Sequence, residues 1–473
     1  MNLQPTIGLE IHVQLDTRTK MFCACELSFG EPPNTRTCPV CLGLPGALPV
    51  LNAQSIHFGL MIGHALGCEL APQSIFHRKN YFYPDLPKGF QISQYDAPLC
   101  RGGSLGDVRI DRVHLEEDAA KLNHVGVSGR IHGAGSSIVD FNRGGTPLVE
   151  VVTEPDLHDA EEARVWLALL AATMRQLGVS DVRMAEGSLR CDANVSLAPA
   201  GSGELGVKTE LKNMNSFSFV KRGIEAEIAR QRALLESGAE VVQQTLHFDP
   251  RSGNLTSLRS KEEAHDYRYF PEPDLVPIAI DEEMVQRARE AVGELPATRI
   301  ARYEHLGLSA EHAHQFAFRP ALGSFFEAVL SAADGASPRE LATWTAHVAA
   351  ALGERDPDAS ALEPAALAAL VALVGAGRVA AGPARTVVLA RLLSQGGDPA
   401  RIVEQEGVGA LDDDAGLADA VAAAIAEHPD AAERLRAGNA KAIGPIVGHV
   451  MRATKGRADG GEVTRLVHER LGL

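Results

Sequence analysis

The sequence predicts an α+β protein, in which a β-rich N-terminal domain is followed by two helical domains. Residues 1–292 contain several runs of alternating apolar and polar residues, separated by turns rich in Gly and Pro, and this pattern is typical of half-buried strands. From residue 293 onward, apolar residues recur at helical spacing in a sequence rich in Ala, Leu, Glu and Arg. A chain of 473 residues also exceeds what one hydrophobic core usually organises, so several domains are expected.

The clearest strand pattern in the N-terminal domain is the segment IGLEIHVQL at 7–15. Its apolar residues fall on one face, whereas Glu10 and His12 fall on the other. Two helices are expected in the same domain, one at 159–177 and one near 219–237.

Four further segments are expected to be strands with a polar face. These faces carry His114, Glu116 and Asp118 (112–118), Glu150 and Glu154 (147–156), Asp192, Asn194 and Ser196 (189–197), and Lys208, Glu210 and Lys212 (207–213). Carboxylates crowded on one surface repel each other unless a cation or basic side chains neutralise them. The pattern therefore indicates a site for Mg²⁺ and phosphate groups, although each strand taken singly also fits an ordinary solvated face.

The helical region is expected to comprise a middle domain at 293–405 and a tail domain at 406–473. The acidic run DDDAG at 412–416 offers an N-cap and negative charge for a helix start. Basic residues gather in the tail: Lys441, Arg452, Lys455, Arg457, Arg465 and Arg470.

Four cysteines form a compact cluster near the N-terminus. Cys23 and Cys25 form a CxC pair, and Cys38 and Cys41 form a CxxC pair after twelve intervening residues. Two close pairs that bracket a short loop favour a tetrahedral Zn²⁺ site, which would be structural because four thiolates leave no open position. A redox pair and metal-free thiols are the alternatives. The other three cysteines, at 68, 100 and 191, are interpreted as buried small apolar residues.

Composition and missing motifs narrow the possible functions. No stretch approaches the roughly 20 continuous apolar residues that span a bilayer, and the first residues lack the features of a signal peptide, so a cytosolic protein is expected. A net charge of −16 does not exclude RNA binding, because phosphate contacts depend on local basic surface. The sequence contains no GxxxxGK[ST], and no Rossmann GxGxxG opens a strand–helix turn. GSS at 135–137 has no lysine arrangement of the amidase type.

Eight ordered motifs within the first 275 or so residues carry a resemblance to a known family. They are IGLEIHVQL, the cysteine cluster with CLGLPGALPVLN, RKNYFYPDLPKGFQISQYD, HLEEDAAK, DFNRGGTPLVEVVTEPD, GSLRCDANVSL, KTELKNMNSF and RSKEEAHDYRYFPEPDL. Together they resemble the B subunit of aspartyl/glutamyl-tRNA amidotransferase, and AIGPIVGHVMRATKG resembles the YqeY-like tail of that family. The resemblance implies that residues 1–292 form a catalytic cradle.

The resemblance further implies a two-step reaction on Glu-tRNA(Gln) or Asp-tRNA(Asn). The side-chain carboxylate of the misacylated residue attacks the γ-phosphate of ATP, and ammonia then displaces phosphate to give the amide. An amidase A subunit supplies the ammonia and a small C subunit completes the complex. This reaction needs positioning and charge neutralisation, which Mg²⁺ held by carboxylates would provide.

Site residues are carried over by the same resemblance. Magnesium and ATP are expected among Glu10, His12, Glu116, Glu117, Glu150, Asp192 and Glu210. The candidate ATP- or substrate-binding residues are Lys79, Asn80, Tyr81, Arg190, Lys212, Asn213, Asp266, Tyr267 and Arg268. A structural role is the alternative for them, and aromatic and basic segments such as NYFYPD and HDYRYFPEP equally fit packed loops. Two rival functions stay open, namely a non-catalytic RNA-binding scaffold and a metal-dependent hydrolase that acts alone.

Overall fold

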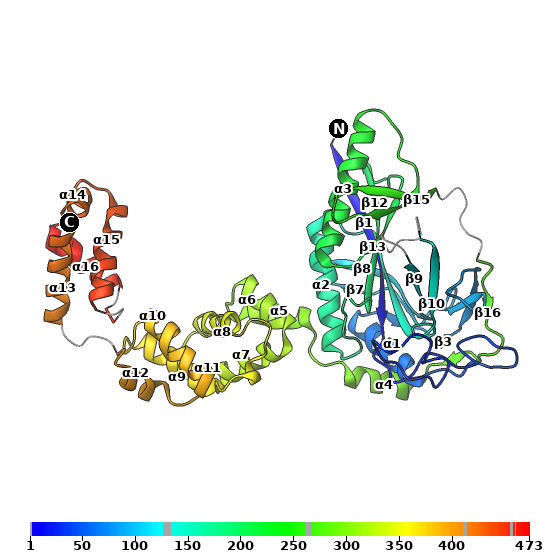
Figure 1. Ribbon diagram of the computed structural model, residues 1–473, viewed down its shortest axis with the longest axis horizontal. Coiled ribbons are helices and arrows are strands. Elements are labelled where there is room, and N and C mark those ends of the chain that lie inside the picture. Colours follow the sequence, from blue (N-terminus) through cyan, green and yellow to red (C-terminus); the bar gives the residue numbers. More distant parts are fainter. Residues whose placement is uncertain (1, 126–133, 261–266, 410–413, 455–456, 459) are drawn as a thin grey trace. The chain divides into compact units, whose positions relative to one another are not determined.

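The computed structural model describes most of the chain (Figure 1). The described residues are 2–125, 134–260, 267–409, 414–454, 457–458 and 460–473. Contacts divide the chain into two compact units, Met1–Ala297 and Thr298–Leu473. The first is rich in strands and the second is helical, so the predicted α+β class is confirmed. The predicted boundaries after residues 292 and 405 stay predictions.

A mixed sheet of ten strands lies at the centre of the described part of the first unit. Its central strand, β1 (Leu3–Gln14), pairs antiparallel with β11 (Pro147–Thr153) on one side and β12 (Leu189–Pro199) on the other. Beyond β11 the order is β8 (Val108–Glu117), β6 (Cys100–Arg101) and β2 (Glu69–Leu70), with β7 (Ser104–Leu105) also paired to β8. Beyond β12 the order is β13 (Thr209–Met214), β14 (Gln244–Phe248) and β15 (Leu255–Ser260), and only the β13–β14 pair of this sheet is parallel.

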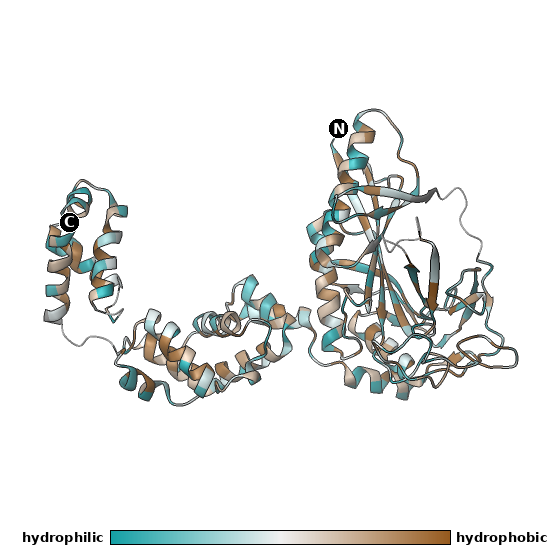
Figure 2. Cartoon of the chain, in the orientation of Figure 1, coloured by the Kyte–Doolittle hydropathy of each residue, from teal (hydrophilic) through white to brown (hydrophobic). Residues whose placement is uncertain are grey.

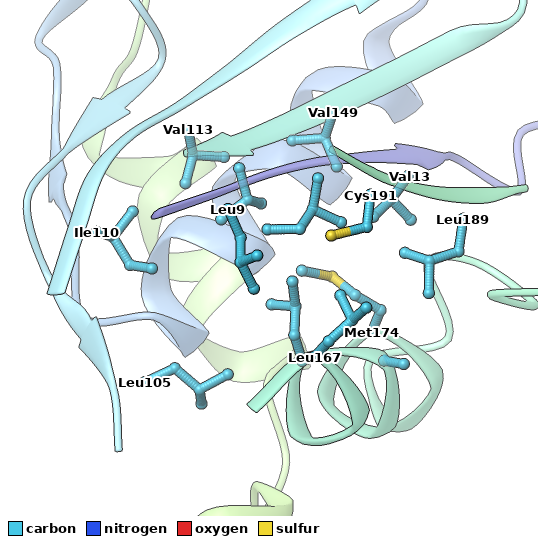
Figure 3. Close-up of a cluster of buried hydrophobic side chains, with 14 of the residues drawn as sticks. Leu9, Val13, Leu105, Ile110, Val113, Val149, Leu167, Met174, Leu189 and Cys191 are labelled. Atoms are coloured by element: carbon cyan, nitrogen blue, oxygen red, sulfur yellow. The ribbon is translucent and has the colours of Figure 1, made fainter. Parts of the chain in front are cut away.

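The two faces of β1 have opposite character, as its alternating sequence requires. Ile7, Leu9, Ile11 and Val13 are fully buried on one face, where they pack against the helix α2 (Ala160–Gln176). Figure 3 shows this core, with Leu167 and Met174 of α2 facing the apolar side chains of the strands. Because one sheet face is committed to the core, the polar side chains of β1 must lie on the other.

The two helices expected in this unit are present and capped as their sequences favour. Asp159 accepts hydrogen bonds from two backbone amides at the start of α2, and Ser216 caps α3 (Phe217–Glu236). Inside α3, the buried carboxylate of Glu227 accepts a hydrogen bond of 2.6 Å from Thr209 on β13. This bond ties the helix to the sheet strand that carries Glu210 and Lys212.

Two helices of the first unit were not expected from the sequence, namely α1 (Ala53–Ala65) and α4 (Glu282–Ala291). In α1, apolar residues occur on several faces and two glycines interrupt them, so the helical period is obscured. Gly59 lets the helix pack closely against the side chain of Leu99, the residue before β6, because a Cβ at this position would lie 2.4 Å from it.

Short strands outside the large sheet form three small sheets. One contains β16 (Phe270–Pro271), β4 (His77–Asn80) and β5 (Phe90–Ser93), another β9 (Lys121–Val125) and β10 (Ser136–Asp140), and the third β3 (Gln73–Ser74) and β17 (Ile278–Ala279). Within the first unit, Figure 2 shows hydrophobic residues concentrated on sheet strands and on parts of the helices.

The described part of the second unit consists of helices joined by loops, and it contains two hydrophobic clusters. One cluster runs from Tyr303 to Val403 and the other from Leu417 to Leu471. The helices of the first are α5 (Pro296–His305), α6 (Ala310–Phe318), α7 (Pro320–Ala332), α8 (Pro338–Leu352), η1 (Pro357–Ala359), α9 (Pro364–Gly375), α10 (Ala381–Pro383), η2 (Ala384–Val388), α11 (Leu389–Gln395) and α12 (Pro399–Glu406). Those of the second are α13 (Asp414–Glu427), α14 (Pro429–Arg436), η3 (Ala440–Ile443), α15 (Gly444–Ala453) and α16 (Gly460–Leu471).

The start of α13 falls at Asp414, within the acidic run expected to begin the tail, while residues 412 and 413 lie outside the described residues. Among the helices described, none is both long and apolar enough to cross a membrane.

The core between α2 and the sheet should be sensitive to truncation at Leu167, which is fully buried. We expect Leu167→Ala to lower the free energy of unfolding by about 2–5 kcal/mol, through reduced apolar burial and the cavity left behind. Val165→Ala is the matched control, because Val165 lies on the same helix and is 36% exposed. Urea denaturation monitored by circular dichroism would test this, and equal midpoints for the two variants would contradict it.

Candidate functional site

Strand register brings the predicted polar residues together on the sheet face opposite the core. His12 on β1 lies opposite Glu150 on β11 and opposite Arg190 on β12. Glu10 lies opposite Asp192. The row continues to β8, where His114 lies opposite Glu150. Side chains that are far apart in the sequence therefore meet because four antiparallel strands, β12, β1, β11 and β8, present the same face.

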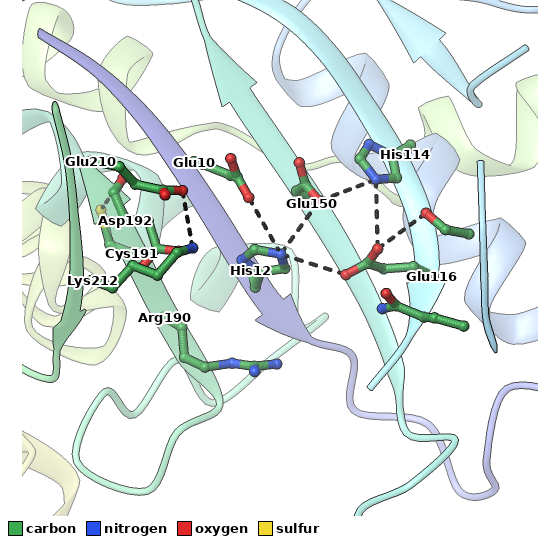
Figure 4. Close-up of polar contacts among 12 residues, drawn as sticks. Glu10, His12, His114, Glu116, Glu150, Arg190, Cys191, Asp192, Glu210 and Lys212 are labelled. Carbon is green, nitrogen blue, oxygen red and sulfur yellow. Dashed lines mark hydrogen bonds and ion pairs between the residues drawn. The ribbon is translucent and has the colours of Figure 1, made fainter. Parts of the chain in front are cut away.

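His12 occupies the centre of this row (Figure 4). Its Nε2 atom lies 3.3 Å from Glu150 Oε2, 3.5 Å from Glu116 Oε1 and 3.9 Å from Glu10 Oε1. One imidazole therefore faces three carboxylates from three strands. We call Glu10, His12, His114, Glu116 and Glu150 the acid–histidine cluster.

His114 is the member of the cluster that the sequence analysis did not select as a site residue. Its Nε2 atom lies 3.2 Å from Glu150 Oε2 and 3.8 Å from Glu116 Oε2. Ser93 on β5 donates a hydrogen bond of 3.1 Å to Glu116. The sequence could have indicated this residue, because His114 and Glu116 lie two positions apart on one strand and their side chains therefore point to the same face.

Burial and mutual charge shift the pKa values of this cluster. Burial lowers the pKa of His114, but the carboxylates of Glu150 and Glu116 outweigh it and raise the value to about 9. For Glu150, burial raises the pKa, whereas the charges and hydrogen bonds of His114 and His12 hold it well below its ordinary range. Burial and the neighbouring Glu150 raise the pKa of Glu10.

A second group of charges continues the row across β12 and β13. Lys212 Nζ lies 2.6 Å from Asp192 Oδ2 and 3.1 Å from Glu210 Oε1. Thr245 on β14 donates a hydrogen bond of 2.8 Å to Glu210. Burial lowers the pKa of Lys212, but the two carboxylates outweigh it and raise the value above its ordinary range.

Arg190 lies on β12, opposite His12, on the same sheet face. Its guanidinium lies 2.8 Å from Asp118, which is buried and also accepts a hydrogen bond of 2.9 Å from Gln14. Asp118 lies 3.6 Å from Arg143 as well. This carboxylate therefore positions Arg190 at the edge of the acid–histidine cluster.

Glu117 lies apart from the acid–histidine cluster, although the family resemblance groups it there. It follows Glu116 on β8, so its side chain points to the other face of the strand. There it forms an ion pair with Lys88 and accepts a hydrogen bond of 2.9 Å from the Ile92 amide.

The residues of the RKNYFYPD segment lie beside the aromatic segment 267–270. Lys79 Nζ lies 4.9 Å from the ring centroid of Tyr267, and the Asn80 side chain donates a hydrogen bond of 2.8 Å to the Arg268 carbonyl. Tyr81 packs edge-on against Tyr267 at 6.0 Å. Burial lowers the pKa of Lys79, but Glu116, together with Tyr269 and Glu150, outweighs it and raises the value.

Two candidate residues have no described side-chain environment. Asn213 lies on β13, next to Lys212, and nothing is described of its side chain. Asp266 lies outside the described residues.

The four cysteines of the N-terminal cluster come together in space. The Sγ atoms of Cys23, Cys25, Cys38 and Cys41 all lie within 4.8 Å of one another. Four thiolates at Zn–S distances of about 2.3 Å around one tetrahedral ion would be about 3.8 Å apart, so little movement would be needed to hold a metal. Asn34 connects the loop between Cys25 and Cys38 to the rest of the unit. Its backbone amide donates a hydrogen bond of 3.1 Å to the Asp140 carboxylate.

A pocket of about 190 Å³ lies between the cysteines and Glu117. Charged groups of both signs line it together with apolar rings, among them Lys20, Lys88, Phe22 and Phe90. The cysteine centre and the underside of β8 therefore share one cavity.

Comparison with known proteins agrees with this architecture. Residues 5–286 match a family model described as the GatB/GatE catalytic domain, and residues 324–471 match one described as the GatB domain. A protein of Frankia casuarinae, named as the B subunit of aspartyl/glutamyl-tRNA(Asn/Gln) amidotransferase, is 48% identical over 99% of this chain and 96% of its own length.

Relatives with the same name occur in other bacteria. The protein of Thermus thermophilus is 47% identical over 99% of both chains. That of Anaeromyxobacter sp. Fw109-5 is 46% identical over 100% of this chain and 99% of its own length. Identity at this level along the whole chain shows that the protein belongs to the family of B subunits of aspartyl/glutamyl-tRNA(Asn/Gln) amidotransferase.

Proposed function

We propose that this protein is the subunit of a tRNA-dependent amidotransferase that activates, with ATP, the side-chain carboxylate of Glu or Asp on misacylated tRNA. The amide then forms with ammonia from a partner amidase subunit. The observation that carries the proposal is the acid–histidine cluster, which gathers charged side chains of three strands on one sheet face in a chain of this family.

The donor set of the cluster fits a divalent cation. Ligand atoms of Glu10, His12 and Glu150 lie within 4.8 Å of one another, and those of His114, Glu116 and Glu150 do so as well. Mg²⁺ prefers oxygen ligands at about 2.1 Å, so the carboxylates are its expected ligands. When bound, Mg²⁺ would neutralise charge on the phosphate oxygens of ATP.

Basic side chains flank the cluster where phosphates would meet them. Arg190 and Lys212 lie on β12 and β13, and about one third of each side chain is exposed to solvent. Lys79 lies on the other side, near Glu116. In the proposed reaction these residues orient the triphosphate, so that a substrate carboxylate oxygen attacks the γ-phosphorus and ADP leaves.

The second step would form the amide from the acyl phosphate. The nitrogen of ammonia attacks the acyl carbon, inorganic phosphate departs with the bonding pair, and the nitrogen loses a proton. We assign the release of ammonia to a partner A subunit, because GSS at 135–137 has no amidase-type lysine arrangement in the sequence. A small C subunit completes the proposed heterotrimer.

The four-cysteine centre is proposed to hold a structural Zn²⁺. Four thiolates fill a tetrahedral shell and leave no open position for water or substrate. The metal would then fix the loop between Cys23 and Cys41, which lines the pocket under β8.

The tail helices are proposed to bind the tRNA body through phosphate contacts. Lys441, Arg452 and Arg470 are exposed, whereas Arg465 is engaged by Glu462 at 2.6 Å and by Glu469 at 2.9 Å. Lys455 lies outside the described residues.

Neutralising Glu150 tests the catalytic role of the cluster. We expect Glu150→Gln to slow ATP-dependent amidation by on the order of 10²-fold or more, because the amide keeps the size of the side chain but removes the charge that offsets a cation. Single-turnover amidation of Glu-tRNA(Gln) and of Asp-tRNA(Asn), with ammonium chloride as nitrogen donor, would measure the rate in the reconstituted complex.

Glu154→Gln is the matched control for this experiment, because Glu154 lies just beyond the same strand, near Arg109. A Glu150→Gln complex that retains the full rate would favour the RNA-scaffold hypothesis. Activity of the isolated chain without tRNA would favour the hydrolase hypothesis.

Metal analysis tests the cysteine centre. We expect about one zinc per chain, and a substoichiometric amount in Cys41→Ser, because three thiolates hold zinc less tightly than four. Cys191→Ser is the control, since Cys191 is buried in the core of the sheet. Inductively coupled plasma mass spectrometry after anaerobic purification would measure the content, and absence of zinc from the wild type would refute the site.

Salt dependence tests the tail. We expect the double variant Lys441→Ala/Arg452→Ala to weaken tRNA binding and to reduce the slope of log K against log salt by about one for each phosphate that the tail no longer neutralises. Arg465→Ala should change the slope less, because acidic partners already engage that guanidinium. Filter binding at several salt concentrations would measure both, and equal slopes for all the proteins would count against phosphate binding by the tail.

A further inference from the structure

Lys20 is fully buried beside the four cysteines, which is unusual for a lysine. Its ammonium donates to the Phe141 carbonyl at 3.1 Å and to Cys41 Sγ at 3.7 Å. Within the described ranges, no carboxylate oxygen lies within 4.0 Å of Lys20 Nζ. Because lysines are rarely buried without an anionic partner, the negative charge that balances this ammonium must be identified.

The carboxylates that line the shared pocket are paired with other basic residues, and Glu272 and Asp274 lie against Arg78. Lys20 and Glu117 both line this pocket. However, Glu117 forms an ion pair with Lys88 and accepts a hydrogen bond from the Ile92 amide. Each lysine of the pocket therefore has its own neighbour, and that of Lys20 is a cysteine sulfur.

Cys41 Sγ receives two donors. The backbone amide of Cys38 lies 3.2 Å from it, and Lys20 Nζ lies 3.7 Å from it. The same sulfur lies 3.5 Å from the Cys38 carbonyl, to which a thiol would donate. If zinc replaces the thiol proton, the sulfur becomes a thiolate that can only accept, and the amide and the ammonium are then its two donors.

We infer that Lys20 is the buried counter-cation of the cysteine centre, where its ammonium stabilises a zinc-bound Cys41 thiolate. The inference rests on the zinc site proposed above. Four thiolates around Zn²⁺ carry a net charge of −2, and one ammonium in direct contact reduces it to −1. Partners outside the ligand shell tune the ligands and the metal affinity in this way.

Lys20 also connects the centre to the segment that leads into β11. Its amide donates to the Cys25 carbonyl at 3.0 Å, and the next amide, of Met21, donates to the Gly145 carbonyl at 2.8 Å. Gly145 has φ +88°, and a Cβ there would lie 3.4 Å from the Lys20 side chain. The lysine thus lies between the cysteine loop and residues 141–145.

The test measures how fast zinc leaves the purified wild-type complex and its variants. We expect Lys20→Met to speed transfer of zinc to the chelator 4-(2-pyridylazo)resorcinol by about 10- to 100-fold, because the thiolates lose their counter-charge. Lys20→Arg keeps the charge and should recover part of the loss. Lys88→Met is the matched control, because Lys88 lines the same pocket and pairs with Glu117.

The outcomes separate this inference from the proposals on which it builds. If the wild type holds zinc and Lys20→Met releases it at the wild-type rate, the role of Lys20 is overturned and the zinc site stands. A Lys20→Met protein with a lower melting temperature but unchanged release would show a purely structural role and would equally overturn it. Lys20→Gln replaces Lys20→Met if the latter does not fold. Wild-type protein without zinc refutes the metal site itself, and none of these results bears on the Glu150 assay.

Discussion

The arrangement of this protein depends on the mutual neutralisation of charge on one face of its sheet. Glu10, Glu116 and Glu150 would repel one another on adjacent strands if nothing lay between them. His12 and His114 lie between them, at 3.2–3.9 Å from the carboxylate oxygens. Buried charge of this kind is costly to a fold unless it is compensated, so its presence indicates a functional requirement.

The opposite face of the sheet supplies the stability that this charge requires. Leu9, Ile11 and Val13 pack with α2 into one core, and their alternation fixes the register of β1. A slip of one residue would place His12 in the core and its apolar neighbours in the cluster. Hydrophobic packing on one face therefore positions chemistry on the other.

The cysteine centre adds a second constraint at the ends of the same strands. Residues 141–145, which lead into β11, contact both Lys20 and Met21 next to the cysteine loop. Behind β8, Glu117 and Lys88 complete the wall of the shared pocket. Glu116 therefore belongs to the acid–histidine cluster and Glu117 to the shared pocket, because successive side chains of a strand point to opposite faces.

Much of this could be predicted from the sequence, because alternation and helical spacing are local properties. They determined the strand β1, the helices α2 and α3, the α+β class and the gathering of Glu10 and His12 on one face. Only tertiary structure decided which strands become neighbours, because pairing joins residues as distant as His12 and Glu150. It therefore alone revealed His114 within the cluster, separated Glu117 from Glu116, and placed Lys20 against Cys41.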